Sequence, residues 1–392
     1  MRKEDTVGIY VHIPFCASKC PYCDFKSIVT SDVSEKEYVE SVLRELSFTV
    51  ERESMMGLPL ESVYIGGGTP SLFSPSSIGR LVESFRKAFQ ADDECEITIE
   101  VNPDSADPLK LSGFRAAGVN RISIGVQSLD DRELKALGRA HTAEKAVEAF
   151  YAARAAGFDN IGIDLIFGIP GQKPHRWRDT LLRALALRPE HISIYGLTIE
   201  EGTPFASAYK NRKYGASESL PEESEEVEMY SSAVELLTEG GWRHYEISNF
   251  GLPGHFSVHN RRYWHGKDYI GLGAAAHSYL SYPGWGRRWW NEPMPSKYVE
   301  DIKRSGEAKI GRESLEKDEA MEESLLLGLR MIEEGINGAA FMDRFGVYPR
   351  EVFKKHAGLE RDGFLRIDGE DIFLAPGGVL LADEILAIAS SP

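Results

Sequence analysis

The stretch His12-Ile-Pro-Phe-Cys16-Ala-Ser-Lys-Cys20-Pro-Tyr-Cys23 carries three of the four cysteines of this 392-residue chain. Three residues separate the first two of these cysteines, and two residues separate the second from the third. Iron-sulfur clusters that only transfer electrons are normally held by four protein thiolates. Three thiolates on a cubane of four irons leave one iron open to a small molecule, so the stretch predicts a 4Fe-4S cluster with a free coordination position.

A structural zinc ion is the alternative for the same stretch, because the three cysteines together with His12 would make a Cys3His site. The sequence disfavours this alternative, since His12 would have to project from a predicted strand toward the same metal. The fourth cysteine, Cys95, stands at the start of another predicted strand and is interpreted as an ordinary thiol. Few and clustered cysteines indicate a reducing compartment rather than a disulfide framework.

Composition predicts a cytoplasmic protein that does not bind nucleic acid. Lys and Arg number 45 against 61 Asp and Glu, a formal net charge of −16, and so negative a chain is repelled by phosphate backbones. The N-terminal residues 1–5 are not followed by the apolar run of a signal peptide, and no segment resembles a membrane span. Hydrophobic residues make up 42% of the chain, which is enough for a large core with two or more domains, or for one large barrel with an appendage.

Up to about residue 200, short β-branched runs alternate with longer amphipathic stretches, the pattern of repeated βα units around a parallel sheet. The six predicted strands are Val7 to Ile13, Ser62 to Ile65, Glu96 to Val101, Arg121 to Val126, Asn160 to Phe167 and His191 to Leu197. The predicted helices between them are Glu35 to Met55, Pro75 to Phe89, Pro108 to Ala117, Ala143 to Ala156 and His175 to Leu187. Gly118 and Gly157 follow two of these helices, where a left-handed cap favours glycine.

Polar and glycine residues stand at the C-terminal end of one predicted strand after another. The cysteines follow the first strand, and the later ends carry Gly66-Gly67-Gly68-Thr69-Pro70, Glu100 with Asn102, Gln127, Asp164 and Tyr195. In barrels built from βα units, chemistry collects at this edge. Six units are too few for a closed eight-stranded barrel, so we predict an α/β fold with a partial (β/α)6 barrel in preference to a doubly wound sheet.

Two of these polar positions, together with Arg139, have a chemical interpretation. Glu100 projects from the side of its strand opposite Ile97 and Ile99, where its carboxylate would meet ribose hydroxyls or an ammonium group. Asp164 interrupts an apolar run, and a buried carboxylate is costly unless a neighbour pairs with it. Arg139 contributes a cation to the same site or neutralises a helix end.

The predicted organisation has three parts: a barrel core at residues 1–200, a barrel extension at 201–313 and a small C-terminal domain at 314–392. An acidic helix near Pro221 to Glu239 opens the extension. A helix through Met321 to Glu333 and a hairpin from Gly363 to Leu374, turning at Asp368-Gly369-Glu370, predict a winged-helix-like α+β domain. Its sixteen acidic and eight basic residues disfavour DNA binding and favour a packing or lid module.

Aromatic and histidine residues crowd into about forty residues of the extension. The segment contains Trp264, Trp285, Trp289 and Trp290, the histidines His255, His259, His265 and His277, and the pairs Arg261-Arg262 and Arg287-Arg288. This mixture suits a porphyrin, with rings against the macrocycle, guanidinium groups to the propionates and a histidine for iron. A structural aromatic cluster between barrel and C-terminal domain explains the same residues, so both interpretations stay open.

The chain resembles the oxygen-independent coproporphyrinogen III oxidase family of radical S-adenosylmethionine (SAM) proteins nearly from end to end. The matching segments are Tyr10 to Cys16, Cys20 to Phe25, Gly66 to Pro70, Gly125 to Ser128, Leu137 to His141 and His259 to Trp264. The chain is more similar to the HemW branch of haem chaperones than to the HemN oxidases, which carry a further cysteine at the position of Phe25. The resemblance implies a TIM-like radical SAM barrel with a C-terminal domain of the HemN type.

The resemblance also implies roles for individual residues. It assigns the cluster to Cys16, Cys20 and Cys23, and contacts with the first SAM to Tyr10, Gly67, Gly68 and Glu100. In the oxidases a second SAM is held at positions that correspond here to Tyr22, Gly68, Thr69, Gln127, Arg139 and Asp164, so one or two SAM molecules are expected. His259 is the expected haem ligand. Relatives commonly carry glycine where this chain has Ala275, and we expect the added methyl group to reshape a pocket wall.

Three functions follow as hypotheses. The first is a haem chaperone that binds a 4Fe-4S cluster, SAM and haem and transfers haem to an acceptor protein. The second is a coproporphyrinogen III oxidase that converts coproporphyrinogen III to protoporphyrinogen IX, which Phe25 disfavours, and catalytic residues are therefore not assigned. The third is a zinc-stabilised scaffold without activity. A small electron donor such as flavodoxin is an expected partner of a radical SAM protein.

Overall fold

The computed structural model describes residues 6–29, 31–210, 219–353 and 356–389. Twelve of the described strands form one sheet in the order β12-β11-β10-β9-β1-β2-β3-β4-β5-β6-β8-β7. The central strands are β1 (Val7–Ile13), β2 (Leu60–Gly67), β3 (Glu96–Val101), β4 (Arg121–Gln127), β5 (Ile161–Phe167) and β6 (His191–Gly196). Consecutive strands of this set of six are parallel to one another, so the predicted set of six parallel strands is confirmed.

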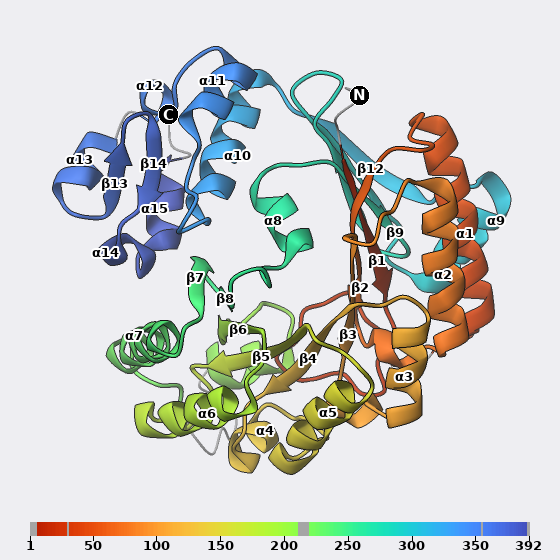
Figure 1. Ribbon diagram of the computed structural model, residues 1–392, viewed down its shortest axis with the longest axis horizontal. Coiled ribbons are helices and arrows are strands. Elements are labelled where there is room, and N and C mark those ends of the chain that lie inside the picture. Colours follow the sequence, from red (N-terminus) through yellow and green to blue (C-terminus); the bar gives the residue numbers. More distant parts are fainter. Residues whose placement is uncertain (1–5, 30, 211–218, 354–355, 390–392) are drawn as a thin grey trace.

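Helices cover the outside of these strands, as Figure 1 shows. They are α1 (Glu35–Arg52), α2 (Pro75–Ala88), α3 (Pro108–Ala116), α4 (Asp131–Ala136), α5 (Ala143–Ala155) and α6 (Pro174–Leu187). Local signals set where they begin: the Ser34 side chain and Glu37 form a capping box at α1, and the Asp107 side chain accepts from two backbone N–H groups at α3. α4 was not predicted from the sequence, because six residues are too few to show a helical period.

The main core lies between the sheet and these helices. Every second residue of β1, from Val7 to Ile13, is fully buried and belongs to one apolar cluster with Val39 and Val42 of α1. Full burial of one such side chain stabilises the fold by about 1.5–3 kcal/mol. The residues between them, Tyr10 and His12 among them, face the opposite side of the strand, because successive side chains alternate. The inner face of the sheet is therefore free to be polar.

Gly118 and Gly157 follow α3 and α5 with φ of 95° and 89°, so both predicted left-handed caps are confirmed. The predicted acidic helix is α7 (Glu223–Glu239), which begins two residues later than expected. The helix predicted through Met321 to Glu333 is α10 (Lys317–Leu329). The prediction placed it four residues too late, because a capping box of Glu316 and Glu319 starts the helix before its first large apolar residue.

The extension adds strands at both edges of the parallel sheet. β7 (Arg243–Glu246) and β8 (Asn249–Gly251) pair antiparallel beside β6, and β9 (Tyr269–Leu272) is parallel to β1. β10 (His277–Leu280), β11 (Arg287–Asn291) and β12 (Lys309–Ser314) continue the sheet as antiparallel strands. Two further helices, α8 (Val258–Trp264) and α9 (Pro295–Ser305), complete this part, and α8 lies between the sheet and the C-terminal helices in Figure 1.

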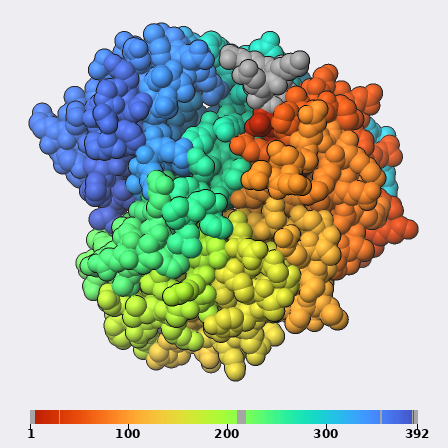
Figure 2. Space-filling model, in the orientation of Figure 1, coloured from red at the N-terminus to blue at the C-terminus, as the bar shows by residue number. Residues whose placement is uncertain are grey.

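The C-terminal residues have a core of their own, built from side chains such as Leu325, Phe341 and Ile372. After α10 come α11 (Gly338–Phe345), α12 (Pro349–Val352), α13 (His356–Arg361), β13 (Leu365–Asp368), β14 (Asp371–Leu374), α14 (Pro376–Val379) and α15 (Ala382–Ala389). The predicted hairpin is confirmed, with Asp368 paired to Asp371 across its turn. In Figure 2 these residues, in blue, form one lobe against the green residues of the extension. None of the described helices combines the length and the apolar character needed to cross a membrane.

Ala275 lies in the turn between β9 and β10 with φ of 60°, in the left-handed region that favours glycine. This placement explains why a glycine suits the position better than a residue with a side chain. Ala275 does not line the cavity at the C-terminal ends of the parallel strands. The methyl group of Ala275 therefore does not reshape a wall of that cavity, as was expected, and its effect is on the backbone conformation of the turn.

We predict that Ala275→Gly raises the free energy of unfolding by about 0.5–1 kcal/mol, because the strain relieved in the left-handed turn exceeds the entropy that glycine adds to the unfolded chain. Urea denaturation followed by circular dichroism measures the change. Ala276→Gly is the matched control: this neighbour has no positive φ and its methyl group is buried, so stability should fall. A less stable Ala275→Gly protein would contradict the strain.

Candidate functional site

A cavity of about 420 Å³ opens at the C-terminal ends of the parallel strands. The predicted site residues that line it are Cys16, Cys20, Tyr22, Cys23, Gly67, Gly68, Thr69, Glu100, Gln127, Arg139 and Asp164. Residues more than one hundred positions apart meet here because parallel strands in register deliver their ends to one edge. The two other predicted site residues, Tyr10 and His259, lie outside the cavity lining.

The cysteine loop is folded against the glycine turn after β2. The Cys16 N–H donates to the Ile28 carbonyl at 3.0 Å, and the Cys23 N–H donates to the Cys20 carbonyl at 3.1 Å, so the loop is closed on itself. A Cβ atom at Gly68 would lie 2.7 Å from the Phe15 carbonyl oxygen and 2.9 Å from Cys16 Sγ. Only glycine therefore lets the turn approach the cysteine this closely.

The three loop cysteines are free and half-buried, and all three line the cavity. No three His, Cys, Asp or Glu side chains of the described residues converge around a single metal ion. A cubane does not require such convergence, because each of three thiolates binds a different iron. The donor set therefore fits a 4Fe-4S cluster better than a mononuclear zinc site.

His12 is not free for the zinc alternative. Its Nδ1 is 2.9 Å from the Tyr10 hydroxyl and its Nε2 is 3.1 Å from the Lys26 carbonyl, and 7% of the residue is exposed. The hydrogen bond to Lys26 fixes the far end of the cysteine loop to β1. His12 thus acts on the loop as a support, and both ring nitrogens are used for that role.

Glu100 forms the floor of the cavity between β2 and β3. Its carboxylate accepts from the Gly67 N–H at 3.0 Å and from the Tyr64 hydroxyl at 2.9 Å. Burial raises the pKa of Glu100 to about 7, and the nearby Asp164 carboxylate adds to this effect. A cation bound in the cavity would favour the ionised form, as expected for a group that meets an ammonium.

Asp164 lies on β5 among hydroxyl groups. Ser123 Oγ lies 3.1 Å and 3.2 Å from its two carboxylate oxygens and donates to them. Burial raises the pKa of Asp164, while hydrogen bonds from Ser193 and Ser123 act in the opposite direction. A buried carboxylate needs a partner, and serine hydroxyls of the two neighbouring strands supply it.

Arg139 spans the cysteine loop and the strand ends. Its Nη1 donates to Cys20 Sγ at 3.4 Å, and its Nη2 donates to Asn102 Oδ1 at 3.0 Å and to the Gly125 carbonyl. The guanidinium group is thus turned into the cavity rather than toward a helix end. A cation beside the cysteines stabilises thiolate charge.

Gln127 ends β4 with φ of 65°, a conformation that costs a non-glycine residue of order 1–3 kcal/mol. A Cβ at Gly125 would lie 2.8 Å from Gln127 Nε2, so the missing side chain there leaves room for the amide group. Strain of this kind is typical of positions held for a ligand.

Several cavity residues were not among the predicted site residues. Arg121, Ser123, His191 and Ser193 line its inner end, and Asn260 of α8 lines its side. The signal for the strand residues was present: Arg121 and Ser123 share the inner face of β4 by the two-residue period, as His191 and Ser193 do on β6. Asn260 could not be found in this way, because only the tertiary fold brings α8 to the cavity.

Tyr10 is close to the cavity without lining it. Its ring lies 6.3 Å from the Tyr64 ring at an interplanar angle of 28°, and its hydroxyl meets His12. Burial and the nearby Glu100 raise the pKa of Tyr10. The side chain stands beside the expected first SAM contacts.

His259 is fully buried and both of its ring nitrogens have partners. Nδ1 lies 2.9 Å from Ser62 Oγ, and Nε2 lies 2.8 Å from the Tyr263 hydroxyl. Burial lowers the pKa of His259 to about 3, with Arg262 and Arg121 contributing. The ring also stacks on Tyr64 at 5.4 Å, so His259 supports the residue that donates to Glu100. In this conformation no lone pair of His259 is open to an iron atom.

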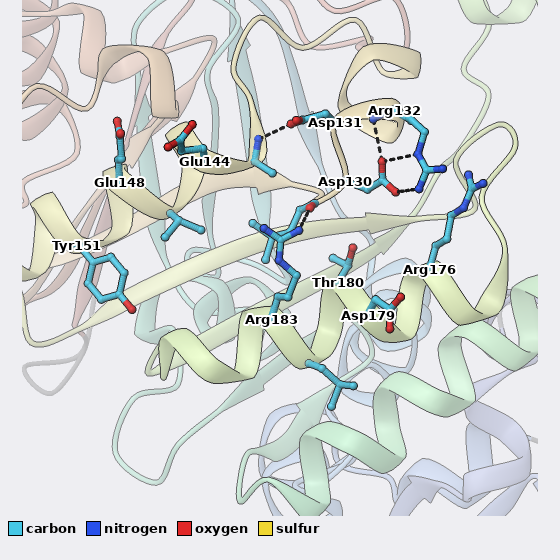
Figure 3. A pocket seen from close by; sticks show the side chains of 14 residues that line it. Asp130, Asp131, Arg132, Glu144, Glu148, Tyr151, Arg176, Asp179, Thr180 and Arg183 are labelled. Atoms are coloured by element: carbon cyan, nitrogen blue, oxygen red, sulfur yellow. Dashed lines mark hydrogen bonds and ion pairs between the residues drawn. The ribbon is translucent and has the colours of Figure 1, made fainter.

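A second hollow lies on the outside of the barrel between α4, α5 and α6 (Figure 3). Its charged lining residues are Asp130, Asp131, Glu144, Glu148, Asp179, Arg132, Arg176 and Arg183. Arg132 pairs with Asp130, and Arg183 donates to the Leu129 carbonyl. Its acidic side chains outnumber the basic ones, and the predicted site residues are all elsewhere.

Comparison with known proteins places these features in a class. The family model of the radical SAM superfamily matches residues 10–184, and that of the HemN C-terminal domain matches residues 315–381. Coproporphyrinogen III oxidase HemN from Escherichia coli, a radical SAM enzyme, superimposes with a TM-score of 0.83 at 25% identity over 99% of this chain and 91% of the other. Fold and site therefore define a radical SAM protein with the HemN architecture.

Proteins of similar sequence show which family within the radical SAM class the chain belongs to. The protein of Bacillus subtilis named "Heme chaperone HemW" is 33% identical over 96% of this chain and 97% of its own length. The protein of the same name from Haemophilus influenzae is 38% identical over 72% of this chain and 73% of its own length. The chain belongs to the HemW family, and a 4Fe-4S cluster and SAM are the cofactors implied by its radical SAM superfamily membership.

We predict that Glu100→Gln makes stability less dependent on pH. The carboxyl group has a pKa of about 7 in the folded protein against 4.5 as the ordinary value, so the folded state keeps a proton that the unfolded state releases. Stability of the natural protein therefore falls as pH rises from about 4.5 to 7, by up to about 3 kcal/mol from this group. Urea titrations of ligand-free protein at pH 5 and pH 8 measure the difference. Equal differences in the natural and variant proteins would contradict the buried proton.

We predict that His259→Ala lowers the free energy of unfolding by about 2–4 kcal/mol, because it opens a cavity and leaves the Ser62 and Tyr263 hydroxyls without their partner. Chemical denaturation measures the loss. His175→Ala, on the exposed face of α6, is the matched control and should leave stability unchanged. A His259→Ala protein as stable as the natural one would show that the buried ring is not structural.

Proposed function

We propose that this chain binds a 4Fe-4S cluster, SAM and haem, and that it transfers haem to an acceptor protein. The observation that carries the proposal is Phe25, which is 59% exposed on the cavity lining where the HemN oxidases have a further cysteine. Relatives named "Heme chaperone HemW" cover nearly the whole chain and support the same function.

Cys16, Cys20 and Cys23 would hold the cluster, with Arg139 beside Cys20 stabilising negative charge on sulfur. A cluster with SAM on its open iron supplies radical chemistry. The Gly66–Gly68 backbone and Glu100 would hold the methionine end of SAM. The glycines let the backbone approach the methionine carboxylate closely, and the Glu100 carboxylate can pair with the methionine ammonium group.

The residues expected at a second SAM share the same cavity. Thr69 and Asn102 are joined by a hydrogen bond of 3.1 Å, and Asn102 in turn accepts from Arg139, so these side chains form one network at one wall. A cavity of about 420 Å³ has the size of a site for a single small ligand. We propose that one SAM occupies it beside the cluster, with Gln127 and Asp164 at its far side.

The partners belong to the same proposal. A haem chaperone needs an acceptor protein, and a cluster that reduces SAM needs a small electron donor such as flavodoxin. The reducing cytoplasm is the compartment in which three free thiols persist for metal. An acidic chain of net charge −16 gives no support to a nucleic-acid partner.

The experiment uses full-length protein with its cluster reconstituted under anaerobic conditions. We expect haemin titration to produce a Soret band that saturates at about one haem per chain, and the iron analysis before titration to give about four irons per chain. Coproporphyrinogen III with SAM and reductant should not yield protoporphyrinogen IX. Formation of that product at the rate of a HemN oxidase assayed in parallel would establish the oxidase instead, and absence of saturable haemin binding would reject the chaperone.

A further inference from the structure

Four histidines of the aromatic segment differ sharply in accessibility. His259 is fully buried, as described above, and the Nδ1 of His255 is buried as well. His265 is half-buried and its Nε2 lies 3.0 Å from a carboxylate oxygen of Glu334. His277 on β10 is exposed, and its ring nitrogens make no hydrogen bond with any residue that the structure describes. Of these four side chains His277 therefore offers the most accessible lone pair.

The imidazole of His277 is held by its neighbours in the sheet. It pairs across to Trp290 of β11, and the two rings stack at 5.8 Å with an interplanar angle of 20°. Trp290 in turn lies across Gly311 of β12, where a Cβ atom would come within 2.2 Å of the indole. The absent side chain at Gly311 lets the indole lie flat on the strand, so it buttresses the exposed imidazole from one side.

The surroundings of His277 favour the neutral form of its imidazole ring. Partial burial lowers the pKa of His277, and Arg288, which lies opposite Tyr279 two residues along β10, adds to this effect. This shift favours the neutral imidazole, the form in which a ring nitrogen binds a metal. The Arg288 guanidinium is itself one-third exposed between Glu313 and Glu323, within reach of an anionic group on a ligand of His277.

His277 also stands close to the cysteine loop. A Cβ atom at Gly271 would lie 2.0 Å from the His277 carbonyl oxygen, and Gly271 pairs with Tyr10 of β1, whose hydroxyl meets His12. His12 is hydrogen-bonded to the Lys26 carbonyl of that loop, and the charge of His277 contributes to lowering the pKa of His12. β10 begins at His277 and runs antiparallel to β9, so His277 stands at the end of the sheet where the cavity opens. A ligand bound at His277 would lie beside the cavity rather than inside it.

We propose that His277 is the axial ligand of a metalloporphyrin bound on the sheet face that carries His277 of β10 and Trp290 of β11. The inference rests on the proposed haem function and locates the haem site at His277. A ring nitrogen of the neutral imidazole donates its lone pair to the haem iron and displaces a water or hydroxide, with no change of oxidation state. Trp290 is a positioning residue that orients the imidazole, and Arg288 pairs with a propionate. An exposed site leaves the opposite face of the haem open to an acceptor.

The test is anaerobic haemin titration of the full chain with its cluster in place, using the natural protein, His277→Ala and the control His175→Ala. His175 is an exposed histidine on α6, remote in sequence from the aromatic segment. We expect His277→Ala to bind haemin about tenfold more weakly or worse and to lose the low-spin Soret maximum, and added imidazole to restore that spectrum. The control should match the natural protein. Because His277 is exposed, the variant should keep its melting temperature.

Three other outcomes have defined meanings. Unchanged affinity and spectrum in His277→Ala would overturn the assignment while leaving haem binding intact. Loss of the spectrum in His265→Ala alone would move the ligand to His265, the half-buried histidine, and overturn the assignment too. Absence of saturable haemin binding by the natural protein would reject the proposed function itself. Trp290→Leu should broaden or shift the haem spectrum with His277 still present, and an unaltered spectrum would remove Trp290 as a positioning residue.

Discussion

The parallel register between β1 and β2 is the constraint on which the site depends. It sets His12 beside Gly66 and Ile13 beside Gly67, so the cysteine loop that leaves β1 meets the glycine turn that leaves β2. Hydrogen bonds from Gly68 to Ile13 and from Thr69 to Phe15 fix this contact. A shift of one residue would turn the apolar side chains of β1 away from the core, and the cost of exposing them holds the register in place.

The same register gives the sheet a polar inner face. Tyr64 links two regions, because its hydroxyl donates to Glu100 at the cavity floor while its ring stacks on His259 of α8. Glu96, at the other end of β3, accepts from the N–H groups of Val258 and His259 at the start of α8. The segment expected to bind haem is therefore built partly as a support for the cavity. Its buried histidine, His259, supports the fold, whereas His277 of the same segment is exposed.

Much of the fold was predictable from local pattern. Strand positions such as β1 and β3 follow from apolar alternation, and α1 and α3 begin at Ser34 and Asp107, which are ordinary caps. The cavity residues at the strand ends were predictable for the same reason, since a parallel sheet brings its carboxyl ends to one edge. The helix predictions failed for α4, which is short, and misplaced α10, which begins at a capping box of two glutamates.

The sequence by itself determined the βα order, the cysteine triad and the residues that end each strand, because these depend on neighbours in the chain. Only the tertiary structure decided which histidine is accessible, since burial of His259 and exposure of His277 arise from contacts with residues such as Ser62 and Trp290, far from each in sequence. It also decided that Ala275 occupies a left-handed turn and that Asn260 reaches the cavity. A motif records which groups are present, whereas packing in three dimensions determines which of them keep a free lone pair.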